Sequence, residues 1–289
     1  MRMELRRDLA IVLRSIPFED RHRVVTALTE KHGQISAMAR NAVQSRRFGG
    51  SLEPFAASDW HFAVKPGAEL HRLDEAQIRR PFEGLRANFE RLSLASVFND
   101  LMLRLAPRDE ACPDLFKLHS NALAILEDAA VRPDEGSEST FLLQLLNGYL
   151  TKLLQWTGSQ PRLLECLACG TRLSALDPAL PLTCVIAEAG WVCDSCRARD
   201  TRHVRGHAMH ALDAGSSIPR VTPAAIVDFH SCLDRPIRQI PEACIATRDE
   251  HKELFRFLEG LMIYHLPGFD RRPMKGLRFL GLESHLSPG

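Results

Sequence analysis

The sequence predicts an α+β protein of several domains, in which a small β-barrel precedes a helical domain that carries an inserted four-cysteine module. Three observations support this fold class. Hydrophobic residues alternate with period two up to about residue 75, and beyond Pro81 they recur at three- and four-residue spacing. Two Cys-x-x-Cys pairs interrupt the helical pattern. The 289 residues leave room for two or three compact units.

The first eighty residues read as strands. Alternating runs separated by turn residues occur at residues 9–13, 23–29, 34–40, 55–64 and 69–75. The turn Lys31-His32-Gly33 predicts a hairpin between the second and third runs, with the apolar residues of the third run on one face. Five short strands in a segment of this size predict a closed or nearly closed barrel of the OB type. We assign this domain to residues 1–80.

Helical periodicity governs most of the remaining chain. Helices are predicted over residues 88–105, 114–130, 140–156, 222–233 and 248–266. Thr222-Pro223 is a typical helix start, with a capping hydroxyl followed by proline at the first helical position. We assign the helical domain to residues 81–160 and 204–289, with residues 161–203 inserted as the cysteine module.

The two cysteine pairs are Cys166-Leu-Ala-Cys169 and Cys193-Asp-Ser-Cys196. Two thiolates held in a turn grip one side of a tetrahedral ion, and a second pair closes the shell, as in a structural zinc site. Gly170 suits the tight backbone of such a turn. Four sulfur ligands leave no position for water or substrate, so the predicted Zn²⁺ supports the fold and catalyses nothing. The alternatives are ordinary buried cysteines or a dithiol redox pair.

The remaining cysteines and the start of the chain indicate a reducing compartment. Four cysteines are predicted to lie singly as small hydrophobic residues: Cys112, Cys184, Cys232 and Cys244. The first eight residues are charged where a secretory signal needs an apolar run. Apolar stretches such as residues 141–154 are broken by polar side chains and fall short of a membrane span. We therefore expect a cytoplasmic protein with no membrane partner.

The 37 basic and 36 acidic residues nearly cancel, but the basic residues are not evenly spread. Between residues 21 and 47 only Glu30 opposes six cations: Arg21, Arg23, Lys31, Arg40, Arg46 and Arg47. Such a barrel wall can neutralise several phosphates and release their counterions, which predicts a DNA-binding surface. The alternative is a solvated strand face without a ligand.

Three further features bear on this surface. Phe48 either stacks on a base, as aromatic residues do in single-strand binders, or plugs the end of the barrel. Trp60 alternates with polar neighbours on a predicted strand, which favours burial. Four arginines follow the second cysteine pair, and they either extend a DNA track or form ordinary surface: Arg197, Arg199, Arg202 and Arg205.

The chain has none of the usual catalytic patterns. It has no phosphate-binding glycine loop with lysine, no nucleophile elbow, no zinc-protease histidine pair and no dinucleotide fingerprint. Its adjacent acidic pairs lie in loops or near helix starts, where carboxylates favour the helix dipole. We therefore predict that this protein is not an enzyme.

Several motifs together resemble the bacterial recombination-mediator family RecO. The first is Arg23-Val-Val-Thr-Ala-Leu-Thr-Glu-Lys-His-Gly-Gln-Ile-Ser-Ala-Met-Ala-Arg40, which is similar to the hairpin of that family's first domain. The others are Arg47-Phe-Gly-Gly-Ser-Leu-Glu-Pro-Phe55, the two cysteine pairs with Gly170, and the tail Arg272-Pro-Met-Lys-Gly-Leu-Arg278. The likeness spans nearly the whole chain.

The resemblance implies a non-enzymatic protein of DNA repair and homologous recombination. Members of the family bind single- and double-stranded DNA and anneal complementary strands. They help load recombinase onto strands coated by single-stranded DNA-binding protein and work with RecR, which implies a nucleoid-associated cytoplasmic location.

Two departures from the family pattern affect the expected DNA contacts. Asn41 stands where the family often has glycine, and asparagine still tolerates a left-handed backbone. The basic run that follows is interrupted by residues 42–44, which leaves Arg46 and Arg47 as the nearest equivalents.

Two rival functions remain at the level of sequence. One is a zinc-containing protein-interaction or transcription-regulatory module with no DNA role. The other is a metal-dependent nucleic-acid enzyme, which the four cysteines without a carboxylate cluster argue against.

Overall fold

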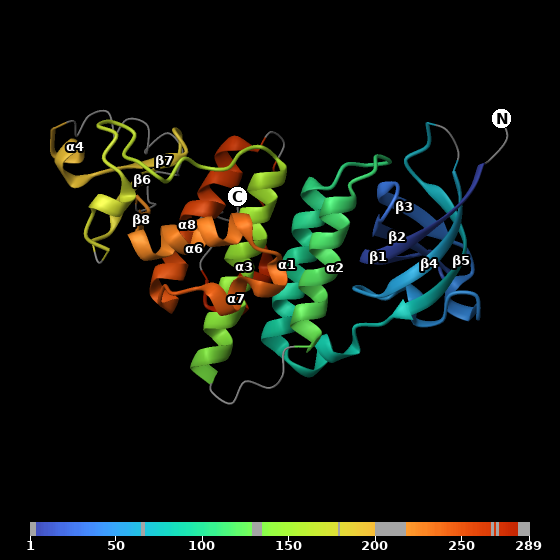
Figure 1. The fold of residues 1–289 in the computed structure, drawn as a ribbon. Helices are drawn as coiled ribbons and strands as arrows, with labels where there is room; N and C mark the ends of the chain where they lie inside the picture. The colour runs from blue at the N-terminus through green and yellow to red at the C-terminus, as the bar shows by residue number, and fades with distance from the viewer. Residues whose placement is uncertain are drawn as a thin grey trace. The chain divides into compact units, whose positions relative to one another are not determined.

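The computed structural model describes residues 4–64, 67–128, 135–178, 180–199, 218–266, 269 and 272–282. The chain divides into two compact units, residues 1–129 and 130–289. The first unit holds the predicted barrel and two helices, and the second holds the remaining helices and the cysteine module (Figure 1). The finer division into three domains stays a prediction.

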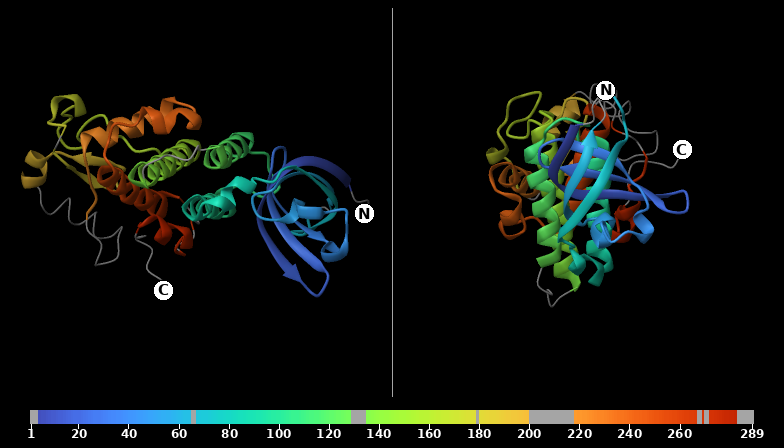
Figure 2. Two further views of the ribbon diagram at one scale, coloured as in Figure 1. Left: turned by 90° about the horizontal axis from the view of Figure 1, so that it is seen from below. Right: turned by 90° about the vertical axis from the view of Figure 1, so that its right-hand side faces the viewer.

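The barrel predicted from alternation is confirmed. Its strands are β1 (Glu4–Phe18), β2 (His22–Thr29), β3 (Gly33–Ala39), β4 (Ala57–Val64) and β5 (His71–Arg80). They close in the order β1-β2-β3-β5-β4, and Figure 2 shows them curving around a common axis. All neighbours pair antiparallel except β3 and β5, whose parallel pairing closes the ring.

The barrel interior is small and tightly filled. Ile35, Ala37 and Ala39 on β3 are almost fully buried, as their shared face predicted. Trp60 and Phe62 on β4 are also fully buried among them, which confirms the expected fate of Trp60. The core thus combines small alanines with large aromatic rings, as the interior of a small barrel requires.

Two helices complete the first unit, α1 (Phe89–Leu105) and α2 (Pro113–Asp128). Asn88 caps α1 by accepting the amide hydrogen of Arg91. A register shift in β1 near Val12 disrupts the strand pairing, and Asn99 on α1 donates to the carbonyls of Val12 and Leu13 there, at 3.3 and 2.9 Å. This buried amide therefore anchors α1 on the barrel.

The second unit is built around the long helix α3 (Glu135–Trp156). It contacts α6 (Pro223–Asp234), α7 (Ile240–Ala243) and α8 (Arg248–His265). Pro223 occupies the first turn of α6 after the Thr222 cap, as predicted, and Thr247 with Glu250 forms a reciprocal capping box at α8.

The cysteine module adds a small sheet to the second unit. Its strands β6 (Leu182–Val185) and β7 (Gly190–Val192) form a hairpin, and β8 (Arg220–Val221) pairs with the other edge of β6. The short helix α4 (Asp194–Arg199) follows β7 directly. The described part of the chain also contains short 3₁₀ turns at Ala42–Gln44, Gly49–Leu52, Glu83–Ala87, Leu173–Ala175, Ile237–Gln239 and Lys275–Leu280.

None of the helices in the described part of the chain combines the length and the apolar character that crossing a lipid bilayer requires.

We predict that His119 makes the first unit sensitive to acid. Burial in α2 lowers the pKa of His119 from 6.5 to about 3, because the charged imidazolium loses its hydration. Between these values the unfolded chain binds a proton that the fold excludes, so stability falls as pH drops below about 6.5. The loss attributable to this group is about 2 kcal/mol from pH 7 to pH 5.

Urea unfolding of the wild type and of His119→Gln at both pH values tests this prediction. The variant is expected to lose less stability on acidification than the wild type. Equal losses in the two proteins would show that His119 titrates normally.

Candidate metal centre and basic surface

The four predicted cysteine ligands come together. The sulfur atoms of Cys166, Cys169, Cys193 and Cys196 all lie within 4.8 Å of one another, although the two pairs are separated by the β6–β7 hairpin. Cys166 and Cys193 are buried, whereas Cys169 is exposed. Four gathered thiols disfavour the alternative of scattered core cysteines.

Backbone geometry presents the thiols as a metal knuckle does. Gly170 has a φ of +70°, the left-handed conformation that glycine adopts without strain, and its amide donates to the Cys166 carbonyl at 2.9 Å. The amide of Cys193 donates to the Cys166 sulfur at 3.3 Å, and the Thr171 hydroxyl lies 3.1 Å from the Cys169 sulfur. Such hydrogen bonds orient thiolates toward a shared ion.

The spacing of the sulfurs fits zinc. A tetrahedral ion with Zn–S bonds of about 2.3 Å separates its ligand atoms by about 3.8 Å. The sulfurs of Cys169 and Cys193 lie 3.7 Å apart. This distance and the grouping of all four sulfurs allow the cluster to bind a metal such as zinc.

The cluster favours the thiolate form at Cys169 and the thiol form at Cys196, where hydrogen bonds with Cys169 and Cys193 raise the pKa to about 12. Hydrogen bonds from the side chain and backbone of Thr171, followed by those from neighbouring thiols, lower the pKa of Cys169 to about 6. The thiolate is the form of cysteine that binds metals.

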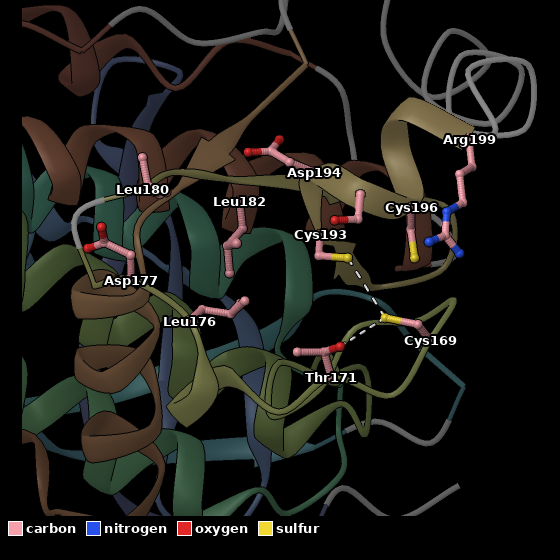
Figure 3. A pocket seen from close by; sticks show the side chains of 11 residues that line it. Cys169, Thr171, Leu176, Asp177, Leu180, Leu182, Cys193, Asp194, Cys196 and Arg199 are labelled. Carbon is pink, nitrogen blue, oxygen red and sulfur yellow. Dashed lines mark hydrogen bonds between the residues drawn. The ribbon is translucent and has the colours of Figure 1, made fainter.

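A pocket of about 410 Å³ borders the cluster. Figure 3 shows the sulfurs of Cys169, Cys193 and Cys196 on one side of it, with Leu176 and Leu182 on another. This opening gives an ion a route to the thiols. The thiols themselves offer four ligands, so a tetrahedral ion bound by all four has no free position for a substrate.

The module is held to the second unit by apolar packing as well. Trp191 on β7 is fully buried, and its indole N–H donates to the Leu163 carbonyl at 3.0 Å. Ile186 packs against Gly260 of α8 so closely that a Cβ there would lie 2.5 Å from it. His265 Nε2 lies 2.7 Å from the Ile186 carbonyl. The module is thus part of the core of this unit, in addition to any stabilisation by metal.

The basic residues of the barrel divide between its two ends. Arg21 precedes β2 and Arg40 follows β3, so the antiparallel hairpin brings these exposed side chains to one end. Lys31 lies in the β2–β3 turn at the opposite end. The seven residues of β3 separate the ends by roughly 20 Å. The charge cluster counted along the sequence is therefore not one patch.

The loop that follows β3 is pinned at the Arg21 end. Asn41 adopts the expected left-handed conformation, with φ 55°, and its amide donates to Nδ1 of His22 at 2.9 Å. The Val43 amide donates to the Arg21 carbonyl at 3.4 Å, and the Ala76 amide of β5 donates to the Arg47 carbonyl at 3.2 Å. These bonds keep the loop arginines beside Arg21 and Arg40.

An ion pair reduces the charge of one member, because Arg23 contacts Glu53 at 3.0 Å. The Arg47 side chain keeps its charge and is held in place by hydrogen bonds to the Ser45 hydroxyl and the Asp74 carbonyl. Among the described residues, no acidic side chain pairs with the exposed Arg21, Arg40 or Arg46. These three guanidinium groups, which we call the arginine end of the barrel, are free to contact an anion.

Arg14 is a cation that sequence reasoning missed. It is exposed on β1 and pairs in register with Thr26 of β2. Arg14 lies outside the basic stretch of residues 21–47. In the sequence, only the pairing expected between the first and second predicted strands indicates that Arg14 lies beside the hairpin.

Phe48 plugs the barrel and does not offer its ring to a base. Only 2% of the residue is exposed, and it packs in the barrel core with Leu52, Trp60 and Leu73. The Arg47 guanidinium lies 5.4 Å from the centre of this ring. Phe48 therefore anchors the loop that carries the arginines.

The second basic cluster lies on α4. Arg197 contacts Asp194 at 3.2 Å, and Arg199 lines the pocket beside the cysteines. Arg202 and Arg205 lie outside the described residues. The two described arginines belong to the second unit, so they are not part of the basic surface of the barrel.

Two of the four remaining cysteines were wrongly expected to lie singly. Cys244 lies close to Asp228 and His251, and its thiol interacts with that of Cys232. Cys112 and Cys184 are buried, and burial raises the pKa of both.

Comparisons with known proteins match both units. The family model described as "Recombination protein O N terminal" matches residues 1–82, and the model "Recombination protein O C terminal" matches residues 86–222.

Three proteins named DNA repair protein RecO are among the relatives. The one from Anaeromyxobacter sp. (strain Fw109-5) is 31% identical over 243 residues, covering 83% of this chain and 89% of the relative. The one from Anaeromyxobacter dehalogenans (strain 2CP-C) is 32% identical over 187 residues, with 64% and 68% coverage. The one from Rhodopirellula baltica is 28% identical over 222 residues, with 75% and 77% coverage.

The five-stranded OB-like barrel, the helical region with its four-cysteine cluster and these matches agree, and the chain belongs to the RecO family of DNA repair and recombination proteins.

Proposed function

We propose that this protein binds DNA through the arginine end of its barrel and mediates recombination by annealing complementary strands. The observation that carries the proposal is the set of exposed guanidinium groups without acidic partners, Arg21, Arg40 and Arg46, gathered by the closed hairpin. Arg23, which is partly neutralised by Glu53, and Arg47, which is hydrogen-bonded to a backbone carbonyl, border them and add further charge.

Annealing requires no bond chemistry. Two strands repel through their phosphates, and cations that neutralise phosphates on one surface reduce that repulsion and release counterions. The bases remain free to pair because the nearby aromatic residue, Phe48, is buried in the barrel. The protein then acts as a mediator without catalytic activity.

The wider role follows from membership of the family. We propose that both single- and double-stranded DNA are ligands, and that the protein helps load recombinase onto strands coated by single-stranded DNA-binding protein, together with RecR, in the nucleoid-containing cytoplasm. Lys31, Arg197 and Arg199 are secondary contacts in this proposal, because each lies away from the arginine end or on the other unit.

We further propose that the four-cysteine cluster binds a structural Zn²⁺ ion. The 3.7 Å spacing of the sulfurs and the amide hydrogen bond to Cys166 support it. When bound, the ion cross-links the two knuckles, and the residues of this chain orient the thiolates around it.

We predict that the triple substitution Arg21→Ala, Arg40→Ala and Arg46→Ala weakens binding to single-stranded DNA about tenfold or more. The slope of log K against log salt concentration becomes less steep by about 0.7 for each lost phosphate contact, so it becomes less steep by up to about 2 in the triple variant. Polarisation titrations with a labelled oligonucleotide at several salt concentrations measure both quantities.

Lys31→Ala at the other end of the barrel is the matched control for that experiment. It removes one exposed cation, as each of the three substitutions does, and it is expected to change affinity little. Equal losses in Lys31→Ala and in each single arginine variant would place the DNA elsewhere. Unchanged binding in the triple variant would favour a protein-interaction module.

We predict that Phe48→Leu lowers stability by about 1–2 kcal/mol through lost core packing, while DNA affinity of the folded protein stays unchanged. Urea unfolding measures the first quantity, and the polarisation assay at low temperature measures the second. If the Phe48→Leu protein is fully folded by circular dichroism and still binds DNA more weakly, the Phe48 ring stacks on a base.

We predict that Cys169→Ser removes one zinc ion per chain and destabilises the second unit. A ligand at a concentration a thousand times its Kd adds about 4 kcal/mol to the free energy of unfolding, and the Cys169→Ser variant loses this contribution. Metal analysis and thermal unfolding are the measurements, with Cys184→Ala as a control that alters a buried cysteine outside the cluster. The same number of zinc ions per chain in Cys169→Ser as in the wild type would refute the proposed ligand set.

A further inference from the structure

A second group of metal-type ligands lies within the helical part of the second unit. Asp228 comes from α6, Cys244 follows α7, and His251 belongs to the first turns of α8. One ligand atom from each lies within 4.8 Å of the other two. We call these residues the Asp–Cys–His cluster.

The histidine faces the cluster with an unused nitrogen. His251 is 1% exposed, and its Nε2 atom is buried without a hydrogen-bond partner. Nε2 lies 3.3 Å from Oδ2 of Asp228, an approach that lacks hydrogen-bond alignment. Two N or O ligands on a tetrahedral ion at about 2.0–2.1 Å lie about 3.3 Å apart. The observed separation therefore matches two ligands of one ion.

The carboxylate is held in place from behind. Asp228 is 1% exposed and accepts the amide hydrogens of Ile245, at 2.9 and 3.1 Å, and Ala246, at 2.8 Å. Outer hydrogen bonds of this kind orient a ligating carboxylate while leaving lone pairs for the ion. The same bonds connect α6 to the segment that carries Cys244.

The thiol gives the cluster an entry path and a further neighbour. Cys244 is only partly buried, so an ion can reach it from solvent. Its thiol donates a hydrogen bond to the Ile240 carbonyl at 3.2 Å. A thiol that binds a metal loses its proton and therefore this hydrogen bond. Cys232 interacts with this thiol and is the nearest additional sulfur.

Asn147 on α3 sets the state of the imidazole. Its amide nitrogen lies 3.2 Å from Nδ1 of His251 and 2.9 Å from the His251 carbonyl, while its Oδ1 is buried without a partner. A metal on Nε2 moves the ring proton to Nδ1. When the Asn147 amide group rotates, its Oδ1 accepts a hydrogen bond from the Nδ1–H group of His251. The hydrogen bond from the Asn147 nitrogen to the His251 carbonyl is then lost.

We propose that Asp228, Cys244 and His251 form a second metal site, which binds a zinc-class transition-metal ion with water in the fourth position. Imidazole nitrogen, thiolate sulfur and carboxylate oxygen are all established zinc ligands, and three protein ligands leave one position open. The ion would join α6, the segment before α8 and α8 itself, three parts of the chain that the four-cysteine cluster does not touch.

The test is cobalt binding to a protein whose four-cysteine cluster has been disabled. The full-length chain with Cys169→Ser and Cys196→Ser is freed of metal and titrated with Co²⁺, whose thiolate charge-transfer and tetrahedral d–d bands report the site. We expect one Co²⁺ per chain with bands typical of a single thiolate. Adding Cys244→Ser should abolish these bands and lower the affinity at least tenfold.

Matched variants separate the possible outcomes. Cys112→Ala, a buried cysteine in the first unit, should leave the bands unchanged, and Cys232→Ser tests whether water is the fourth ligand. His251→Gln should also abolish the bands. If this variant of a buried residue does not fold, Cys244→Ser still tests the site, because Cys244 is partly exposed. Absence of Co²⁺ binding in the disabled protein, or bands that survive Cys244→Ser, would overturn the second site without affecting the four-cysteine cluster.

Discussion

Closure of the barrel by the parallel pairing of β3 with β5 is the constraint on which the proposed DNA surface depends. It places the β5 backbone beside the loop that leaves β3, so that the Ala76 amide bonds to Arg47 and Phe48 enters the core. The loop is then fixed from within the barrel and from the β1–β2 turn. Because the loop is fixed, the proposed binding of its arginines to a nucleic-acid backbone would cost little loop entropy.

The second unit combines two kinds of stabilisation. The close packing of Ile186 on Gly260 and the contact of His265 with the Ile186 carbonyl join the cysteine module to α8. The thiol cluster adds a cross-link that can be made only when its ligands are deprotonated. In the function proposed for this chain, a metal would support the shape of this unit and surface charge would bind DNA, since the four thiols leave a tetrahedral ion no position for a substrate.

The buried polar groups of the second unit form one connected arrangement. Asn147, His251 and Asp228 link α3, α8 and α6, and the Asp228 carboxylate holds two amides of the segment before α8. Buried polar atoms are normally satisfied, but two atoms of this network, Nε2 of His251 and Oδ1 of Asn147, have no hydrogen-bond partner. The proposed ion would bind the first of these atoms, and rotation of the Asn147 amide would satisfy the second.

The sequence by itself determined the five barrel strands, the five longer helices and the two cysteine pairs, because alternation, helical periodicity and Cys-x-x-Cys spacing are local properties of the chain. It did not indicate the short elements β6, β7, β8, α4 and α7. Tertiary structure decided the rest. It paired Arg23 with Glu53, carried Lys31 to the far end of the hairpin and buried Phe48, because contacts between distant residues depend on strand register. It also brought Asp228, Cys244 and His251 together from separate elements, a grouping that only helix packing produces.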